Sequence, residues 1–230
     1  MNSLKIFINI NIFLKKIDVL VNSDNEKKPV YSKSIKIQTS VIFEDLENIL
    51  KKTILEIENK FRISVNNVNL MIESQKLKSI NITIKENFEN KILSKAGIEY
   101  LLQDLRQQII ENHPEKKFVH MIFKNCFVDG DEYNNIPIGK NCKTFVIEVC
   151  FIYLKKDLIN KLEILLRSHQ VEINKLICTN YAKSLLNTEI DDLHKASLAV
   201  INESNLNEVT IISKKTSKLG FFEKLFHIFS

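Results

Sequence analysis

Cysteine and histidine are the side chains whose chemistry could define a catalytic or metal-binding site in this sequence. The four cysteines show no C-x-x-C spacing and have no histidine at ligand spacing beside them, which argues against zinc and against dithiol redox chemistry. His120 lies in a predicted strand, where a hydrogen-bonded core or edge histidine is more common than a general base. We therefore expect buried, reduced thiols and no catalytic histidine. The residues concerned are Cys126, Cys142, Cys150, Cys178, His113, His120, His169, His194 and His227.

Acidic residues offer no better candidate for a reactive centre. Asp129, Asp131 and Glu132 stand close enough in sequence to suggest calcium, but the ligand order of an EF-hand loop is absent. The pair Asp191 and Asp192 lies in a polar loop and is most simply a solvated turn. Serine nucleophile motifs are lacking as well. The sequence therefore predicts a protein that is not an enzyme and that uses neither a metal nor a cofactor.

Composition and charge narrow the class of protein further. The chain has 230 residues and 44% hydrophobic residues, which suffices for a buried core. Its net charge is +5, but basic and acidic residues are interleaved along most of the chain, so a nucleic-acid partner is not expected. The apolar opening segment is interrupted by Asn9 and Asn11, and no apolar run approaches the roughly 18 residues that span a bilayer. We expect a cytoplasmic protein.

Hydrophobic periodicity predicts alternating strands and helices, hence an α/β fold. Ile6, Ile8 and Ile10 alternate with other residues at the period of a strand, whereas Leu46, Leu50 and Ile54 recur at helical spacing. Strands are predicted at 6–12, 17–21, 30–38, 68–72, 80–84, 118–123, 144–153 and 171–178. Helices are predicted at 43–61, 98–110, 157–168 and 181–186. Asp157 would be the N-cap of the third helix. A closing hairpin is predicted at 198–201 with 209–212.

Two residue runs in the middle of the chain carry a family resemblance. The first is His120-Met121-Ile122 followed by Val128-Asp129-Gly130. It is similar to a run in the small inserted subdomain, called 1C or SHS2, of the bacterial cell-division protein FtsA. Ile136-Pro137-Ile138-Gly139 is similar to its next element, while Phe123 stands where the family usually has proline. The similarity extends over about 30–200, where the helix near Leu158, the strand ending at Cys178 and the alanine Ala182 follow in the family's order.

This resemblance implies a domain organisation. Residues 1–79 would be the N-terminal part of the first actin-like lobe, which has a ribonuclease H-like sheet, and 80–155 would be the inserted 1C subdomain with a strand-helix-strand-strand order. Residues 156–212 would return to the actin-like lobe through a helix, a strand and a remnant hairpin. Residues 213–230 would be a linker and an amphipathic membrane-targeting helix.

The residues that would hold ATP phosphates in the actin-like superfamily are replaced in this chain. Such turns need an acidic residue and glycine, because backbone N–H groups must approach the phosphates closely. By the resemblance, Asn9 and Asn11 stand in the first turn and Asn202 begins the second, whereas all four glycines lie elsewhere. The part of FtsA that would complete the nucleotide cleft and dock the tubulin-like protein FtsZ has no counterpart. We therefore expect a pseudo-ATPase, and we do not expect FtsZ binding.

The last dozen residues predict an amphipathic helix at a membrane surface. At 100° per residue one narrow arc of 219–230 holds Gly220, Glu223, Lys224, His227 and Ser230, and the rest of the wheel is apolar. Lysines before and within the helix favour an anionic membrane as the partner. The alternative is a helix that packs back on the domain. The expected membrane-binding residues are Lys214, Lys215, Lys218, Leu219, Phe221, Phe222, Lys224, Leu225, Phe226, Ile228 and Phe229.

Together these features predict a non-catalytic adaptor for bacterial cell division. It would lie on the inner face of the cell membrane at the division site and would recruit other divisome proteins to the septum through its 1C-like surface, with self-association also open. The competing prediction is a scaffold like the pilus-assembly protein PilM, with the last helix packed internally. The expected partner-binding residues are Glu99, Arg106, Asp129, Gly130, Pro137 and Gly139.

Overall fold

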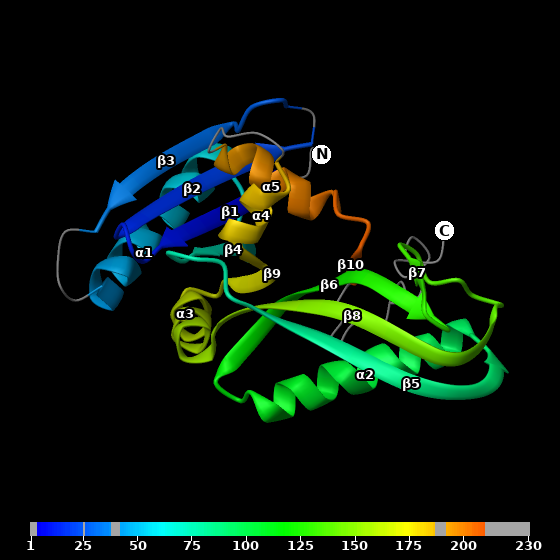
Figure 1. Cartoon of the computed structure of the whole chain (residues 1–230). Helices are drawn as coiled ribbons and strands as arrows, with labels where there is room; N and C mark the ends of the chain where they lie inside the picture. The colour runs from blue at the N-terminus through cyan, green and yellow to red at the C-terminus, as the bar shows by residue number, and fades with distance from the viewer. Residues whose placement is uncertain (1–3, 25, 38–41, 187–191, 210–230) are drawn as a thin grey trace. The chain divides into compact units, whose positions relative to one another are not determined.

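The chain forms two compact α/β units in the computed structural model, which describes residues 4–24, 26–37, 42–186 and 192–209 (Figure 1). Unit 1 comprises Met1–Leu77 and Asp157–Asn202. Unit 2 comprises Lys78–Lys156 and Glu203–Ser230. Each unit has its own sheet, so the predicted mixed α/β class is confirmed.

Unit 1 is built on a five-stranded sheet in the order β3-β2-β1-β4-β9. The first three strands form an antiparallel meander, whereas β4 runs parallel to β1, and β9 runs parallel to β4. This order agrees with the ribonuclease H-like sheet that the resemblance led us to expect. The strands are β1 (Leu4–Asn11), β2 (Lys16–Ser23), β3 (Tyr31–Lys36), β4 (Asn67–Glu73) and β9 (Glu172–Cys178).

The helices of unit 1 follow the apolar spacing of the sequence. Leu46, Leu50 and Ile57 are almost fully buried along one face of the first helix, while Lys51 and Lys52 on its other face are exposed. Asp157 was predicted to be the N-cap of the third helix but lies within its first turn, because the helix begins one residue earlier. The helices are α1 (Ile42–Phe61), α3 (Lys156–Ser168), α4 (Thr179–Ser184) and α5 (Leu193–Ile201).

The predicted hairpin of 198–201 with 209–212 is wrong. The first of these segments belongs to α5, whose N-cap is Asp192, with its Oδ1 accepting a hydrogen bond of 3.0 Å from the N–H of Lys195. Asp192 is thus a helix cap rather than the solvated turn that we expected. A short apolar run such as 198–201 has the same composition in a buried strand and in a buried helix, so its periodicity does not separate them. The second segment contributes β10 (Glu208–Val209), which pairs with a strand of unit 2, and 210–212 lie outside the described residues.

Unit 2 is an antiparallel sheet in the order β10-β6-β8-β5, with β7 paired to β6 at one end. Its order along the chain is the predicted strand, helix, strand and strand, and the strands are longer than their apolar patterns indicated. The elements are β5 (Ser79–Ile92), α2 (Lys95–Asn112), β6 (Lys116–Val128), β7 (Asp131–Tyr133) and β8 (Asn141–Lys155).

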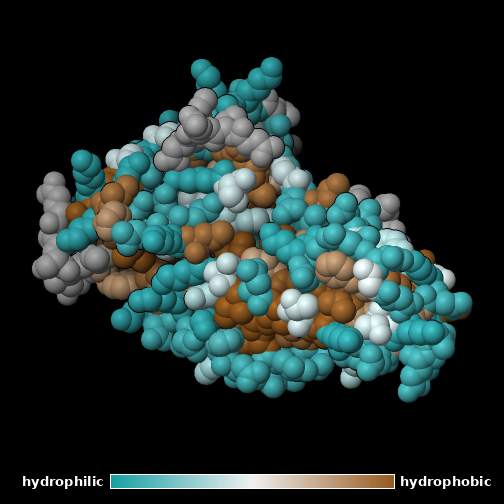
Figure 2. Space-filling view, viewed as in Figure 1, coloured by the Kyte–Doolittle hydropathy of each residue, from teal (hydrophilic) through white to brown (hydrophobic). Residues whose placement is uncertain are grey.

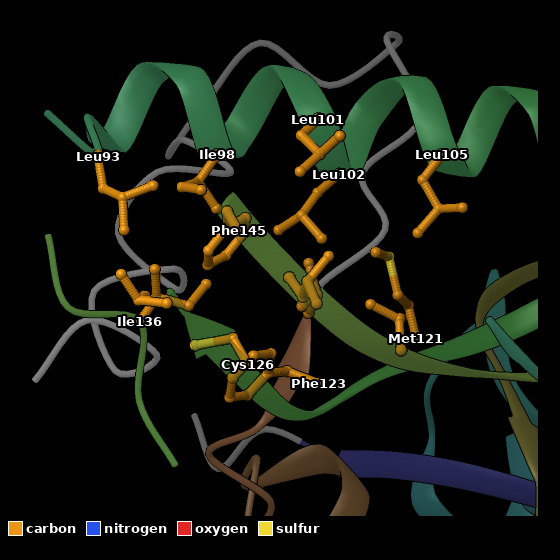
Figure 3. Packing of buried hydrophobic residues seen from close by; sticks show 14 of the residues in the cluster. Leu93, Ile98, Leu101, Leu102, Leu105, Met121, Phe123, Cys126, Ile136 and Phe145 are labelled. Atoms are coloured by element: carbon orange, nitrogen blue, oxygen red, sulfur yellow. The ribbon is translucent and has the colours of Figure 1, made fainter. Parts of the chain in front are cut away.

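The core of unit 2 lies between α2 and one face of this sheet (Figure 3). Ile98 and Leu102 project from the helix toward Phe145 on β8, and Leu105 projects toward the part of the sheet that carries Met121. The helix begins where the Ser94 side chain caps it by accepting a hydrogen bond of 3.1 Å from the N–H of Gly97. It ends just before Pro114, which is disfavoured within a helix. The helix therefore covers the sheet for most of its length.

Candidate functional site

The carboxyl ends of the parallel strands in unit 1 form a polar cluster. Asn9 on β1 is buried, and its Oδ1 accepts a 2.7 Å hydrogen bond from the Thr179 hydroxyl just after β9. Its Nδ2 lies 3.4 Å from Oε2 of Glu73 at the end of β4 and 3.5 Å from Oδ2 of Asp18 on β2. The ammonium group of Lys183 on α4 lies 2.5 Å from Oε1 of the same Glu73.

The cluster does not fit a magnesium ion. The amine of Lys183 already neutralises Glu73, the carboxylate at the end of the central strand, so a cation there would meet a positive charge. Among the described residues no three His, Cys, Asp or Glu side chains come together as a ligand set. The arrangement is therefore that of an internally satisfied polar network, in which Asn9 links three strands to α4.

The turn between β1 and β2 is equally unsuited to cradle a phosphate. It runs through 12–15 without glycine, and its backbone N–H at Leu14 donates a 2.9 Å hydrogen bond to the side chain of Asn11. The side chain of Asn11 thus stabilises the turn. Asn202, which was expected to begin a second phosphate turn, is instead the C-cap of α5, with its N–H donating to the carbonyl of Leu198 at 2.8 Å.

The histidine and the cysteines that the sequence analysis considered are buried in the structure. Nδ1 of the buried His120 lies 2.7 Å from Oε1 of Glu208, a contact that links β6 to β10. All four cysteines are free and buried, as expected. Burial, with a smaller effect of Cys142, raises the pKa of Cys126 to about 12, so that this thiol is protonated and a poor nucleophile at neutral pH.

Two of the expected partner-binding residues, Glu99 and Arg106, are less accessible than we expected. Glu99 on α2 is only 7% exposed, and its Oε1 has no hydrogen-bond partner among the described residues. Burial raises the pKa of Glu99 above its ordinary value, and Lys95 offsets part of this effect. Arg106 is half-buried, and burial lowers its pKa. The burial of Glu99 makes it a poor contact for a partner, whereas Arg106 keeps part of its surface exposed, and partner binding by either residue stays a prediction.

The other four expected residues shape the loops of unit 2. Asp129 accepts hydrogen bonds from the N–H groups of Lys143 at 2.9 Å and Thr144 at 2.8 Å, and these bonds lower the pKa of Asp129. Gly130 has a φ of +99° and Gly139 a φ of +87°, which other residues rarely adopt. The N–H of Gly139 also donates to the carbonyl of Leu93 at 2.9 Å, beside the half-buried Pro137. These residues fix the path of the loop.

A groove between α2 and β5 is the main surface feature that the sequence analysis missed. It has a volume of about 300 Å³, and Figure 2 shows hydrophobic side chains gathered in this region. The strand β5 is the last in its sheet, so within the described residues its outer edge pairs with no other strand. The floor of the groove is apolar, and its rim is polar and includes two acidic residues. The lining residues are Ile82, Ile84, Leu101, Leu105, Ile109, Glu86, Asp104, Gln108, Asn112 and His113.

The predicted membrane-binding residues, 214–229, lie outside the described residues. No helix of the described part of the chain is long and apolar enough to cross a membrane.

The fold defines a mixed α/β protein whose unit 1 has the sheet of an actin-like lobe. No family model matches the sequence, and no curated protein matches it. Similar solved structures include the cytoplasmic domain of EpsL, an inner membrane component of the type II secretion system of Vibrio cholerae, at 14% identity and a TM-score of 0.38, with 78% of this chain and 57% of that chain covered.

A second similar structure is the PilM-PilN type IV pilus biogenesis complex, at 12% identity and a TM-score of 0.45, with 81% of this chain and 50% of that chain covered. A third is a Bacteroides thetaiotaomicron protein with an actin-like ATPase fold and unknown function, at 14% identity and a TM-score of 0.30, with 79% of this chain and 54% of that one covered. This chain thus spans about half the length of these structures. The likeness assigns no functional residue or partner to it.

Proposed function

We propose that this chain is a non-catalytic adaptor that holds a partner protein at a membrane surface. The observation that carries the proposal is the groove of unit 2, an apolar cleft beside the edge of β5, which pairs with no other strand in the described part of the chain. The polar cluster of unit 1 supports the non-catalytic part, because Lys183 occupies the place of a cation beside Glu73.

The partner that fits this groove is an extended peptide segment. Its backbone would hydrogen-bond to the free edge of β5 and extend the sheet, while alternate side chains would enter the groove between the strand and α2. Ile82 and Ile84 are only partly buried, so they retain apolar surface for such side chains. The rim residues Glu86 and Asp104 favour a segment that also carries a basic residue.

The free edge of β5 is limited to its first part. Around Glu89 and Asn90 the register with β8 shifts and both residues have positive φ, of 48° and 65°. Such a bulge twists a strand and discourages further pairing. We therefore place the peptide along 79–87, beside the middle of α2.

Membrane attachment is proposed from the sequence of the tail. Phe222 and Phe226 belong to an apolar arc that no ordinary solvent-facing helix has, and Lys214, Lys215 and Lys218 precede it. A short helix of this kind folds as it enters the headgroup region, so binding would be reversible and stronger on anionic lipid.

The assembly that this adaptor would serve is proposed to be the cell-division machinery, on the strength of the FtsA-like residue pattern around Asp129 and Gly139. The second candidate is a pilus or secretion assembly, the setting named for two of the similar structures. A fluorescent fusion of the full chain separates the two, since bands at mid-cell support cell division and foci at the poles support a pilus role. Diffuse fluorescence would contradict both.

A site-specific cross-link tests the groove directly. A photoactivatable residue at Gln108, which lines the groove, is expected to capture a protein partner in cells. The matched control is Tyr100 on the same helix, which is 74% exposed but does not line the groove. Ile84→Lys should abolish capture from Gln108, and thermal unfolding of the same variant controls for the packing against the core that Ile84 loses. Equal capture from both positions would show that the groove is not the docking site.

Vesicle binding tests the tail. Phe222→Glu with Phe226→Glu should release the full chain from vesicles that contain phosphatidylserine while its thermal unfolding stays nearly the same. A sharp fall in melting temperature, together with no sedimentation of the unaltered chain with vesicles, would mean that the tail belongs to the core.

A further inference from the structure

The turn between β1 and β2 exposes two large apolar side chains. Phe13 is 63% exposed and Leu14 is 60% exposed, and they are neighbours at the tip of the hairpin. The hydrophobic face of the same hairpin is otherwise buried, as Ile10 and Ile17 show with exposures of 1% and 0%. The exposed apolar surface of this hairpin is therefore confined to its tip.

The tip is held in one conformation by hydrogen bonds. Asn11 Oδ1 accepts from the N–H of Leu14 at 2.9 Å, and the carbonyl of Lys15 accepts from the N–H of Ile37 at 2.7 Å. Lys15 has a φ of +48°, a conformation that residues other than glycine seldom adopt. A backbone outlier of this kind, kept by surrounding hydrogen bonds, is more frequent at functional positions than elsewhere. The two apolar side chains are thus presented on a fixed support.

The charge around the tip is positive. Lys15 follows Leu14 directly and is exposed, and Lys16 lies opposite Lys36 across the β2–β3 pair. Like charges directly opposite in a sheet repel each other. The ammonium group of Lys16 forms an ion pair of 2.9 Å with Asp18, which leaves a surplus of two positive charges among these four residues. An apolar tip with lysines beside it, here called the lysine collar (Lys15 and Lys36), complements a lipid bilayer, which has an apolar interior and can carry anionic headgroups.

We propose that this hairpin tip is a second membrane contact, which inserts Phe13 and Leu14 into the headgroup region of an anionic bilayer. Lys15 and Lys36 would meet lipid phosphates or carboxylates at the same depth. This contact is separate from the predicted tail helix and rests on described residues alone. Two attachments on one chain would strengthen binding by avidity.

A single introduced tryptophan tests insertion, because the chain contains no natural tryptophan. The full chain with Phe13→Trp is mixed with phosphatidylcholine vesicles that contain phosphatidylserine. The fluorescence should shift to shorter wavelength and should be quenched by brominated lipid. The matched control is Tyr100→Trp on α2, since Tyr100 is 74% exposed and the residues one helical turn away include Gln103 and Asp104 but no lysine. Its emission should stay as in water.

Loss of the tip should weaken partitioning by about ten-fold or more, given the apolar surface removed. The variant is Phe13→Ser with Leu14→Ser in the full chain, and its control is Leu55→Ser with Ile164→Ser, two exposed apolar residues of the same unit. Lys36→Ala should weaken binding about five-fold at low salt and much less at high salt.

The outcomes of these experiments either support the proposal or overturn it. Water-like emission from the tryptophan at position 13 on a chain that sediments with vesicles would exclude the tip while leaving the tail in place. Equal loss of partitioning in the tip variant and its control would do the same. Insertion that persists when Phe222→Glu and Phe226→Glu are added, at correspondingly higher lipid concentration, would support a contact independent of the tail. A spectral shift that appears only with a protein partner and never with vesicles would assign the tip to a protein interface.

Discussion

Replacing Glu99 with glutamine is expected to stabilise the protein at neutral pH. Glu99 is 7% exposed, and its Oε1 has no hydrogen-bond partner among the described residues. A buried polar atom without a partner costs about 1 to 3 kcal/mol, and more when it is charged. Lys95, which precedes it by one helical turn, recovers part of this cost. Glu99→Gln keeps the shape and removes the charge, so we expect a gain of about 1 kcal/mol in the free energy of unfolding.

The pH dependence of this gain follows from the direction of the pKa shift. Burial raises the pKa of Glu99 in the folded protein above its value in the unfolded chain, so the folded state binds the proton more tightly. The favourable contribution of protonated Glu99 is complete below the unfolded pKa of about 4.3 and is lost as the pH rises through the folded pKa. The advantage of the glutamine variant should therefore be largest at neutral pH and should shrink as the pH falls toward 4.

Urea unfolding at several pH values measures both effects. The matched control is Glu111→Gln on the same helix, where the carboxylate is exposed and accepts a 2.9 Å hydrogen bond from Gln107 that the glutamine can keep. We expect the control to change stability by less than about 0.5 kcal/mol. A loss of stability in Glu99→Gln at neutral pH, or a gain that does not shrink in acid, would refute the assignment of Glu99 as a buried, uncompensated carboxylate.

Three further predictions test other parts of the molecule. Phe145→Ala should lower the free energy of unfolding by about 3 to 5 kcal/mol in urea titrations, because Phe145 is fully buried and packs edge-on against Phe88 at 6.1 Å between ring centroids. Gly130→Ala should lower it by about 1 to 2 kcal/mol although an added Cβ meets nothing within 4 Å, since the φ of +99° alone disfavours alanine, and an unchanged midpoint would contradict this. Calorimetry with magnesium-ATP should show no binding with a dissociation constant in the low micromolar range. Such a constant corresponds to a binding free energy of about 8 kcal/mol, which the cluster of Asn9 and Lys183 does not supply.

Much of the secondary structure could be predicted from the spacing of apolar residues. Ile6, Ile8 and Ile10 mark β1, and Leu46, Leu50 and Ile54 mark α1, because each pattern extends over several residues and fits only one period. The apolar pattern of β5 ends near Ile84, yet the strand continues to Ile92. Its second half is held by pairing with β8, a tertiary contact that leaves no mark in the side-chain pattern.

The surfaces were harder to predict than the elements. The burial of Glu99 depends on what packs beside α2, and helical spacing alone places a charged residue on the exposed face. The groove depends on the separation between α2 and β5, although the isoleucines of β5 and the leucines of α2 were visible as apolar rows. Asp129 was noticed as part of a motif, but its two backbone hydrogen bonds to β8 require the paired strands to exist.

The chain order of the strands in unit 1 imposes a sequence of events during synthesis. β4 is flanked by β1 and β9, but β9 follows the whole of β5 to β8 along the chain. While the ribosome is still translating unit 2, the apolar residues Val68, Leu70 and Ile72 therefore lie on a strand with one open edge. An open edge of this kind can pair with another nascent chain. Within unit 2, β6 and β8 pair from Val128 and Phe145 outward at short sequence separation, so this pair can form during that interval.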